Sequence, residues 1–195
     1  MNDTKVIVGN FSYLNASTAD GEYLNMAFQP NSIPLKQRWR NNGLSADFLG
    51  DYVTTFFPKV DDVPETATRQ AEIQAAVSYV ANELLENGMK YSDINSGVAI
   101  GISLFLFDDH IIITEVNPTS AEQSKAYKDF VDRLSESDPM EMFMEQLEAK
   151  AMDDSSSGLG FLTMINDYGA ELSWQFDYSI GGDVVTITSE VRIPV

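Results

Sequence analysis

The chain contains no cysteine and one histidine, His110. The lack of cysteine excludes disulfide bonds, cysteine–zinc sites and thiol catalysis. A single histidine argues against a histidine-rich metal site, a Ser-His-Asp triad and a histidine phosphoacceptor segment. No run of about 18 apolar residues occurs, so we expect no transmembrane helix. The first residues, MNDTKVIVGN, lack the pattern of a signal peptide, and we expect a cytoplasmic protein.

Basic residues are also scarce. The 12 lysines and arginines face 30 aspartates and glutamates, which gives a formal net charge of −18. Such a surface repels nucleic acid and anionic membranes, so neither is expected as a partner. An anionic ligand such as ATP would need a divalent cation or a local basic patch. Lys36, Arg38 and Arg40 surround Trp39; this segment could dock an acidic partner or be an extended stretch with its charges in water.

The length and the apolar content bound the fold. With 195 residues, 44% of them hydrophobic, the chain suits a single domain, 1–195. Hydrophobic periodicity predicts strands at 5–14, 22–29, 97–107 and 111–116, helices at 43–57, 66–91, after Ser120, at 138–151 and after Gly160, and a terminal hairpin. This order favours an α+β two-layer sandwich, with one mixed, mainly antiparallel sheet and helices on one face. Residues 1–60 would supply the N-terminal strands and helix, and 61–195 the core, with a possible lid at 118–157.

The predicted helix 66–91 carries an unusual polar stripe. Glu83 and Asn87 lie one turn apart on one side of the helix, and Lys90 continues the same side. Gly88 lies beside them, although glycine in a helix interior costs about 1 kcal/mol relative to alanine. Close approach of a ligand or of a strand would offset that cost.

Two motifs around this stripe suggest a family. Residues 83–91, ELLENGMKY, resemble the N-box of the GHKL (histidine kinase-like ATPase) superfamily, usually Glu-Leu-x-x-Asn-Ala-x-Lys-Tyr. Residues 158–161, GLGF, resemble the second glycine box, which opens a helix in that superfamily. The resemblance implies a GHKL-like sandwich that binds ATP and Mg²⁺.

A closer resemblance is to the SiaB-type proteins of this superfamily. Three segments carry it: 32–49, the helix end 82–92, and 157–176. SiaB-type proteins are bacterial serine kinases of partner-switching circuits. The resemblance therefore implies an ATP-dependent serine/threonine kinase that acts on a STAS-type antagonist protein, with a cognate phosphatase and possible homodimerisation.

The resemblance also implies a role for each matching residue. Asn87 would bind Mg²⁺, and Glu83 would order or deprotonate the attacking hydroxyl group. Lys90 would help to neutralise phosphate oxygens, although it could equally be a surface lysine. Gly158 and Gly160 would let the backbone approach the triphosphate, close to a helix N-terminus.

One segment departs from the superfamily pattern. Where the first glycine box reads Asp-x-Gly-x-Gly, this chain reads TEVNPTS. Asn117 stands about where the adenine-binding Asp is expected, and a neutral amide is a weaker acceptor than a carboxylate. The sequence therefore leaves two functions open: the kinase, and a non-catalytic protein-binding switch with a degenerate nucleotide site. The Met-rich helix 138–151 could serve as a lid, as a partner surface or as ordinary core.

Overall fold

The computed structural model describes residues 4–12, 14, 21–29, 35–93, 95–152 and 158–195, except for the side chains of 35–39 and 150–152. The elements in chain order are β1 (Lys5–Val8), β2 (Tyr23–Phe28), α1 (Leu35–Thr54), α2 (Pro64–Tyr91), β3 (Ile100–Leu106), β4 (His110–Ser120), α3 (Ala121–Glu136), α4 (Pro139–Met152), α5 (Leu159–Tyr168), β5 (Glu171–Asp177) and β6 (Val184–Pro194).

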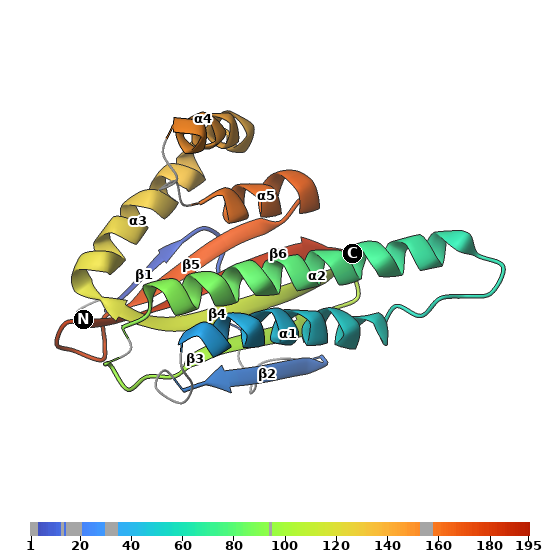
Figure 1. The fold of residues 1–195 in the computed structure, drawn as a ribbon, viewed down its shortest axis with the longest axis horizontal. Helices are drawn as coiled ribbons and strands as arrows, with labels where there is room; N and C mark the ends of the chain where they lie inside the picture. The colour runs from blue at the N-terminus through green and yellow to red at the C-terminus, as the bar shows by residue number, and fades with distance from the viewer. Residues whose placement is uncertain (1–3, 13, 15–20, 30–34, 94, 153–157) are drawn as a thin grey trace.

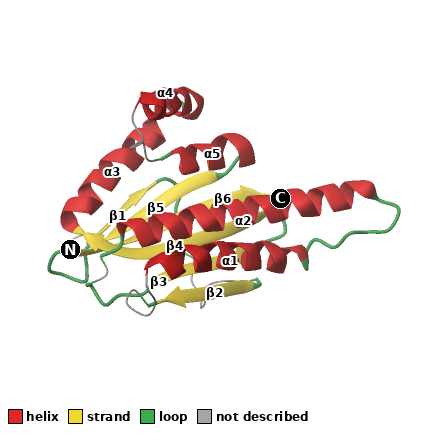
Figure 2. Cartoon of the chain, in the orientation of Figure 1, coloured by secondary structure: helices red, strands yellow, loops and turns green. Residues whose placement is uncertain are grey.

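The strands form one open antiparallel sheet in the order β1-β5-β6-β4-β3-β2 (Figure 1). The central ladder joins β4 to β6, from His110 opposite Pro194 to Ser120 opposite Val184. The predicted α+β class, with a mainly antiparallel sheet and helices, is confirmed (Figure 2).

Helices α1, α2 and α5 cover one face of this sheet (Figure 1). The long helix α2 buries Val77, Val80 and Leu84 at helical spacing, as its periodicity predicted. Against them pack inward side chains of the sheet, among them Ile113 and Trp174, which are 0% and 1% exposed. This core fixes α2 over the centre of the sheet.

Helix α1 begins earlier than the predicted helix 43–57. The alternative of an extended segment around Trp39 is wrong, because residues from Leu35 onward are already helical. The sequence LKQRWRNN is rich in good helix formers, and the helix continues through Gly43 despite its low propensity. Arg40 is exposed, whereas the side chains of Lys36, Arg38 and Trp39 lie outside the described ones.

Strand β4 is longer than the predicted strand 111–116. It continues through Asn117 and Pro118 to Ser120, and there it pairs with β6 alone, since its pairing with β3 ends at Val116. Proline has no N–H group and is tolerated where a strand edge is free. The Ser120 side chain then accepts a hydrogen bond from the backbone N–H of Gln123 and caps α3, the helix predicted after Ser120.

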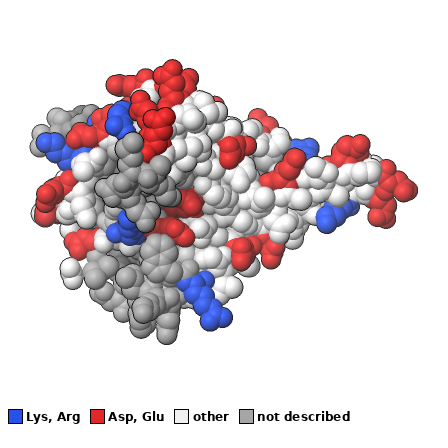
Figure 3. Space-filling view, turned by 45° about the horizontal axis from the view of Figure 1, so that its top comes forward, with Lys and Arg blue, Asp and Glu red and all other residues white. Residues whose placement is uncertain are grey.

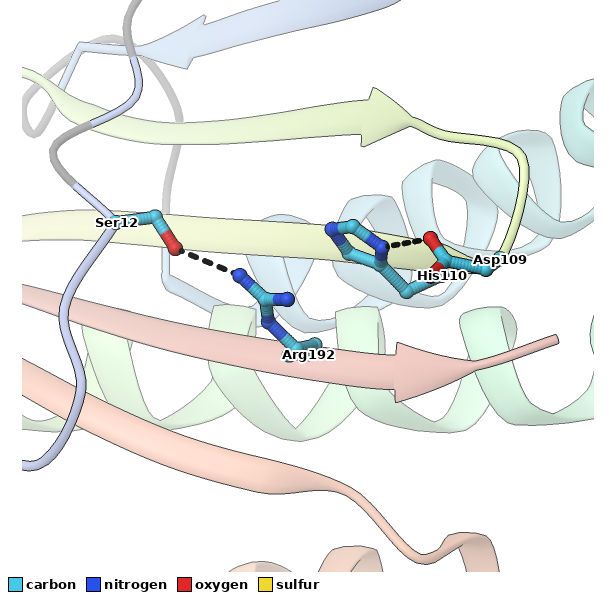
Figure 4. Close-up of polar contacts among 4 residues, drawn as sticks. All are labelled: Ser12, Asp109, His110 and Arg192. Carbon is cyan, nitrogen blue, oxygen red and sulfur yellow. Dashed lines mark hydrogen bonds and ion pairs between the residues drawn. The ribbon is translucent and has the colours of Figure 1, made fainter.

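The N-terminal chain is tied to the other face of the sheet. The backbone N–H and the hydroxyl group of Ser12 donate hydrogen bonds of 3.0 and 2.7 Å to the carboxylate of Glu190. Arg192 donates a hydrogen bond to the Ser12 hydroxyl oxygen, as Figure 4 shows. His110 pairs with its neighbour Asp109 at the start of β4 (Figure 4). The histidine is the first residue of β4, opposite Pro194 of β6, rather than part of the preceding turn.

Charge is unevenly distributed over the surface. Acidic side chains are spread across the face shown in Figure 3 and recur at the projecting end of the molecule, where α2 begins. Exposed acids there include Asp61, Asp62 and Glu65. Within the described residues, no helix is both long enough and apolar enough to cross a membrane.

Candidate functional site

A cavity of about 270 Å³ lies between the C-terminal half of α2, the second half of β4, the start of α3 and the residue that opens α5. Its lining residues are Asn87, Tyr91, Glu115, Asn117, Thr119, Gln123, Ala126, Tyr127, Phe130, Gly158, Phe161, Ile187 and Ser189. Segments far apart in the sequence therefore meet around one space large enough for part of a small ligand.

Three of the residues selected from the sequence lie together here. Asn87 from α2, Asn117 from β4 and Gly158 at the start of α5 all line the cavity. Asn117 is 6% exposed and lies at the buried end of this group. Gly158 has φ +109°, a conformation that favours glycine, and an added Cβ would also lie 2.7 Å from the Phe130 ring. The glycine is thus required by both backbone and packing.

The other three lie outside the cavity lining. Glu83 packs against the first turn of α5, where a Cβ on Gly160 would lie 2.1 Å from its Oε2. Lys90 is exposed at the end of α2, and its Nζ lies 5.0 Å from the centre of the Tyr91 ring. Glu83 and Asn87, one turn apart, therefore face Gly160 and Gly158 at the same helix start.

Gly88 is explained by a strand rather than by a ligand. It is buried on α2, and a Cβ there would lie 2.1 Å from Oε1 of Glu115 and 3.4 Å from Ile100. The absence of a side chain lets strand β4 bring a carboxyl group against the helix backbone. The predicted close approach of a strand at this position is confirmed.

Glu115 is the most unusual polar group of the site. It is 2% exposed, it lines the cavity, and its Oε1 has no hydrogen-bond partner among the described residues. Burial raises the pKa of Glu115 well above its ordinary value, because the charged form loses its hydration. The neutral carboxyl group offers one O–H donor and one acceptor oxygen.

Aromatic rings form the walls of the cavity. Tyr127, Phe130 and Phe161 form a triangle of rings, with centroids 6.3, 6.4 and 6.3 Å apart. Burial raises the pKa of the Tyr127 hydroxyl group, whose oxygen accepts a 3.0 Å hydrogen bond from Nε1 of Trp174. Flat, rigid and mostly apolar walls of this kind suit a planar ligand.

The polar rim is held by α2 and α3. The Thr119 hydroxyl group lies 3.0 Å from both the Tyr91 carbonyl oxygen and Oε1 of Gln123. This network joins the end of α2 to the end of β4 and the first turn of α3.

Positive charge at the site comes from the backbone. None of the residues that line the cavity is a lysine or an arginine. The N-terminus of α5, which begins beside Gly158 and has no acidic residue in its first turn, supplies a partial positive charge and free N–H groups. An anionic group at this end would still require a cation.

Glu115 was missed by the sequence analysis. It sits in the run IIITEV, two positions from Ile113, which faces the core. In a strand, residues two apart share a face, so Glu115 had to point inward with the isoleucines. The signal available in the sequence was the two-residue spacing of Ile111, Ile113 and Glu115.

The sequence matches no protein-family model and no curated protein.

Proposed function

We propose that this chain is a SiaB-like cytoplasmic regulator with a GHKL-like nucleotide site, which transfers phosphate from ATP to a serine or threonine of a STAS-type antagonist protein. A cognate phosphatase would reverse the transfer. The observation that carries the proposal is the convergence of Asn87, Glu115, Asn117 and Gly158 on one cavity. The N-box and the glycine-box segments, far apart in the sequence, meet there.

The aromatic end of the cavity suits the adenine base. The edge of adenine presents an amino donor, and the carboxyl group of Glu115, which lines the cavity, offers an acceptor oxygen. Tyr127 and Phe161 supply flat walls for the ring. In this proposal Glu115, rather than Asn117, receives the base, and Asn117 lies beside it.

Asn87 and the start of α5 suit phosphates and Mg²⁺. Asn87 offers a neutral amide oxygen, and Mg²⁺ commonly takes one or two protein ligands and fills its other positions with phosphate and water. The start of α5 at Gly158 offers N–H groups to anionic oxygens. The fit is consistent with the role that the resemblance implies for Asn87.

Glu83 is the proposed base for the partner hydroxyl group. It lies one turn from Asn87 and against Gly160, at the helix start where the phosphates would lie. The bound nucleotide supplies the phosphoryl group, and Glu83 would hold or accept the proton of the attacking hydroxyl group.

A phosphotransfer assay tests the kinase. Wild-type protein, radiolabelled ATP, Mg²⁺ and a panel of purified STAS-domain proteins should give label on at least one substrate. Glu83→Gln should lower the rate by about 100-fold or more, the scale of general-base catalysis. Glu86→Gln serves as the matched control, because Glu86 lies on the same helix outside the cavity lining and accepts a hydrogen bond from Asn82. Equal loss in both variants contradicts a specific role for Glu83.

A non-catalytic binding switch is the second candidate. The observation that favours it is the absence of lysine and arginine from the cavity lining, together with the position of Glu83 outside it. Under this alternative, nucleotide or partner binding persists but no substrate is labelled. Nucleotide binding without transfer to any STAS protein would therefore favour the switch.

A further inference from the structure

Helix α1 carries an exposed apolar stripe on its outer side. Leu44, Phe48, Tyr52 and Phe56 follow one another at four-residue spacing, and Phe56 lies in the turn just after the helix. Leu44 is 59% exposed, Phe48 50% and Phe56 42%. The ring centroids of Phe48 and Tyr52 are 6.2 Å apart, and those of Tyr52 and Phe56 are 5.4 Å apart. We call these four residues the α1 stripe.

The α1 stripe is not needed to anchor the helix. The other side of α1 buries Ala46, Leu49 and Val53, which are 2%, 1% and 0% exposed and belong to the core. A surface helix ordinarily has one apolar side and a polar side opposite. This helix has a second apolar side, about 18 Å long at 1.5 Å per residue, turned to solvent.

Carboxylates flank the α1 stripe on both sides. On the side of α2 lie the exposed Asp47 and Asp51, and Asp51 accepts a 2.7 Å hydrogen bond from Gln74 of α2. On the side of β2 lies the exposed Glu22, which accepts a 2.7 Å hydrogen bond from the Tyr52 hydroxyl group. Arg40, one turn before Leu44, places a positive charge at the N-terminal end.

This pattern argues against two kinds of occupant, an anionic membrane and a second copy of the chain. An anionic membrane would be repelled by a protein with a net charge of −18, and so would a second copy of the chain. The exposed area is also small: since a buried aromatic side chain removes about 150–250 Å² from water, four partly exposed residues offer on the order of 300 Å². A stable dimer buries about 800 Å² per partner.

We propose that the α1 stripe docks an amphipathic helix of a partner protein, with apolar residues at three- and four-residue spacing flanked by lysines or arginines. The apolar residues pack along Leu44, Phe48 and Phe56. The flanking basic residues meet Asp47 and Asp51 on one side and Glu22 on the other. An acidic residue at one end of the partner helix meets Arg40 and sets its direction.

Fluorescence anisotropy with a designed peptide tests this inference. The probe is a fluorescein-labelled 18-residue helical peptide with leucines at i, i+4, i+7 and i+11 and lysines beside them. A second peptide carries glutamates in place of the lysines. Wild-type protein should bind the lysine peptide at least about tenfold more tightly than the glutamate peptide, and the difference should shrink in 0.5 M NaCl.

Two substitutions locate the binding. Phe48→Asp should weaken binding of the lysine peptide by about tenfold or more, and Leu44→Ser should act in the same direction. Met144→Asp is the matched control, because Met144 is 52% exposed on a different helix, α4, and should leave binding within twofold. Circular dichroism melts of each variant verify that it is folded.

Three results would overturn the proposal. If the Phe48→Asp protein binds the lysine peptide as tightly as the wild type, the α1 stripe is not the binding site. Equal affinity for the two peptides would remove the charge complementarity. Concentration-dependent dimerisation that Phe48→Asp abolishes, measured by sedimentation, would assign the surface to a second copy of the chain.

Discussion

At the scale of single residues, the contact between Glu115 and Gly88 accounts for the glycine inside helix α2. The carboxyl group of Glu115 lies against the backbone of Gly88, inside the core and beside the cavity. The glycine gives up about 1 kcal/mol of helix propensity, and burial raises the pKa of the carboxyl group. A glycine inside a helix and a buried carboxyl group both lower stability, and such unfavourable local features are typical of functional sites.

Gly88→Ala is expected to destabilise the protein, although alanine is the better helix former. The new methyl group would lie 2.1 Å from Oε1 and 2.9 Å from Cδ of Glu115, so the buried Glu115 side chain, the strand or the helix must shift. Overpacking of this kind costs about 1–3 kcal/mol of unfolding free energy. Urea denaturation measures it.

Gly43→Ala is the matched control. Gly43 also lies inside a helix, but nothing lies within 4 Å of the position of its added Cβ. This substitution should raise the free energy of unfolding by about 0.5–1 kcal/mol. A Gly88→Ala protein that gains stability as Gly43→Ala does would contradict the close packing of Glu115.

Glu115→Gln is expected to change how stability depends on pH. Because the pKa of Glu115 is raised in the folded state, the folded protein retains a proton that the unfolded chain releases above its ordinary pKa of 4.5. Wild-type stability therefore falls as the pH rises from about 4.5 through the raised folded pKa. Glutamine does not titrate and removes this loss.

The quantity to measure is the difference in the free energy of unfolding between wild type and Glu115→Gln at each pH. Urea unfolding at pH 5, 6, 7 and 8 should show Glu115→Gln gaining stability relative to wild type as the pH rises. Other titrating groups cancel in this difference. Parallel pH profiles would show that Glu115 keeps an ordinary pKa.

At the scale of elements, the start of α5 depends on α2. Glu83 lies against Gly160 in the first turn of α5, and Asn87 shares the cavity with Gly158. The carboxylate of Glu83 stands near a helix N-terminus, where negative charge is favourable by about 0.3–1 kcal/mol. The contact sets the distance between the two helices at the proposed phosphate end.

A double-mutant cycle between Glu83 and Gly160 tests this contact. Gly160→Ala places a methyl group 2.1 Å from Oε2 of Glu83 and should destabilise the protein. In a Glu83→Ala background the same change should cost at least about 0.5 kcal/mol less, because the clashing carboxylate is gone. Additive effects in urea unfolding would show that the two residues do not touch in solution.

Elements with a strong hydrophobic periodicity could be predicted from the sequence. Elements whose bounds depend on contacts with other elements could not. The apolar face of α2, from Ile73 to Gly88, follows directly from the sequence. The early start of α1 was missed because residues 35–42 show no apolar period before Gly43. The extension of β4 was missed because Pro118 reads as a breaker, and only its one-sided pairing with β6 permits it.

The site was predictable only where motifs carried it. Asn87, Asn117 and Gly158 were selected from their spacing and resemblance, and they do line one cavity. Glu115 was missed because its importance depends on the register of β4 against α2, which brings its carboxyl group to Gly88. The placement of Glu83 against Gly160 likewise depends on how α5 packs.

At the scale of the whole molecule, charge opposes the compact state. Thirty acidic residues against 12 basic ones give a net charge of −18, and acidic side chains crowd the projecting end of α2 (Figure 3). Self-repulsion of this size is screened by salt over a Debye length of about 10 Å at 0.1 M. The same field repels ATP unless a divalent cation accompanies it.

Salt is therefore expected to stabilise the protein. Raising NaCl from about 20 mM to about 500 mM should raise the melting temperature by about 2–5 °C, because screening weakens the repulsion among surface carboxylates. Differential scanning calorimetry measures it, with an equal osmolality of sucrose as the control. A melting temperature that falls in NaCl would show that attractive ion pairs outweigh the repulsion.

Isothermal titration calorimetry with ATP and Mg²⁺ tests the central claim, that the cavity around Asn87 and Glu115 is a nucleotide site. Wild-type protein should bind ATP in the presence of Mg²⁺ and lose that binding in EDTA. Asn87→Ala should abolish the magnesium-dependent part, while Asn82→Ala, on the same helix but outside the cavity lining, should bind as wild type does. No heat of binding with the wild-type protein, or unchanged magnesium-dependent binding by Asn87→Ala, would contradict the account.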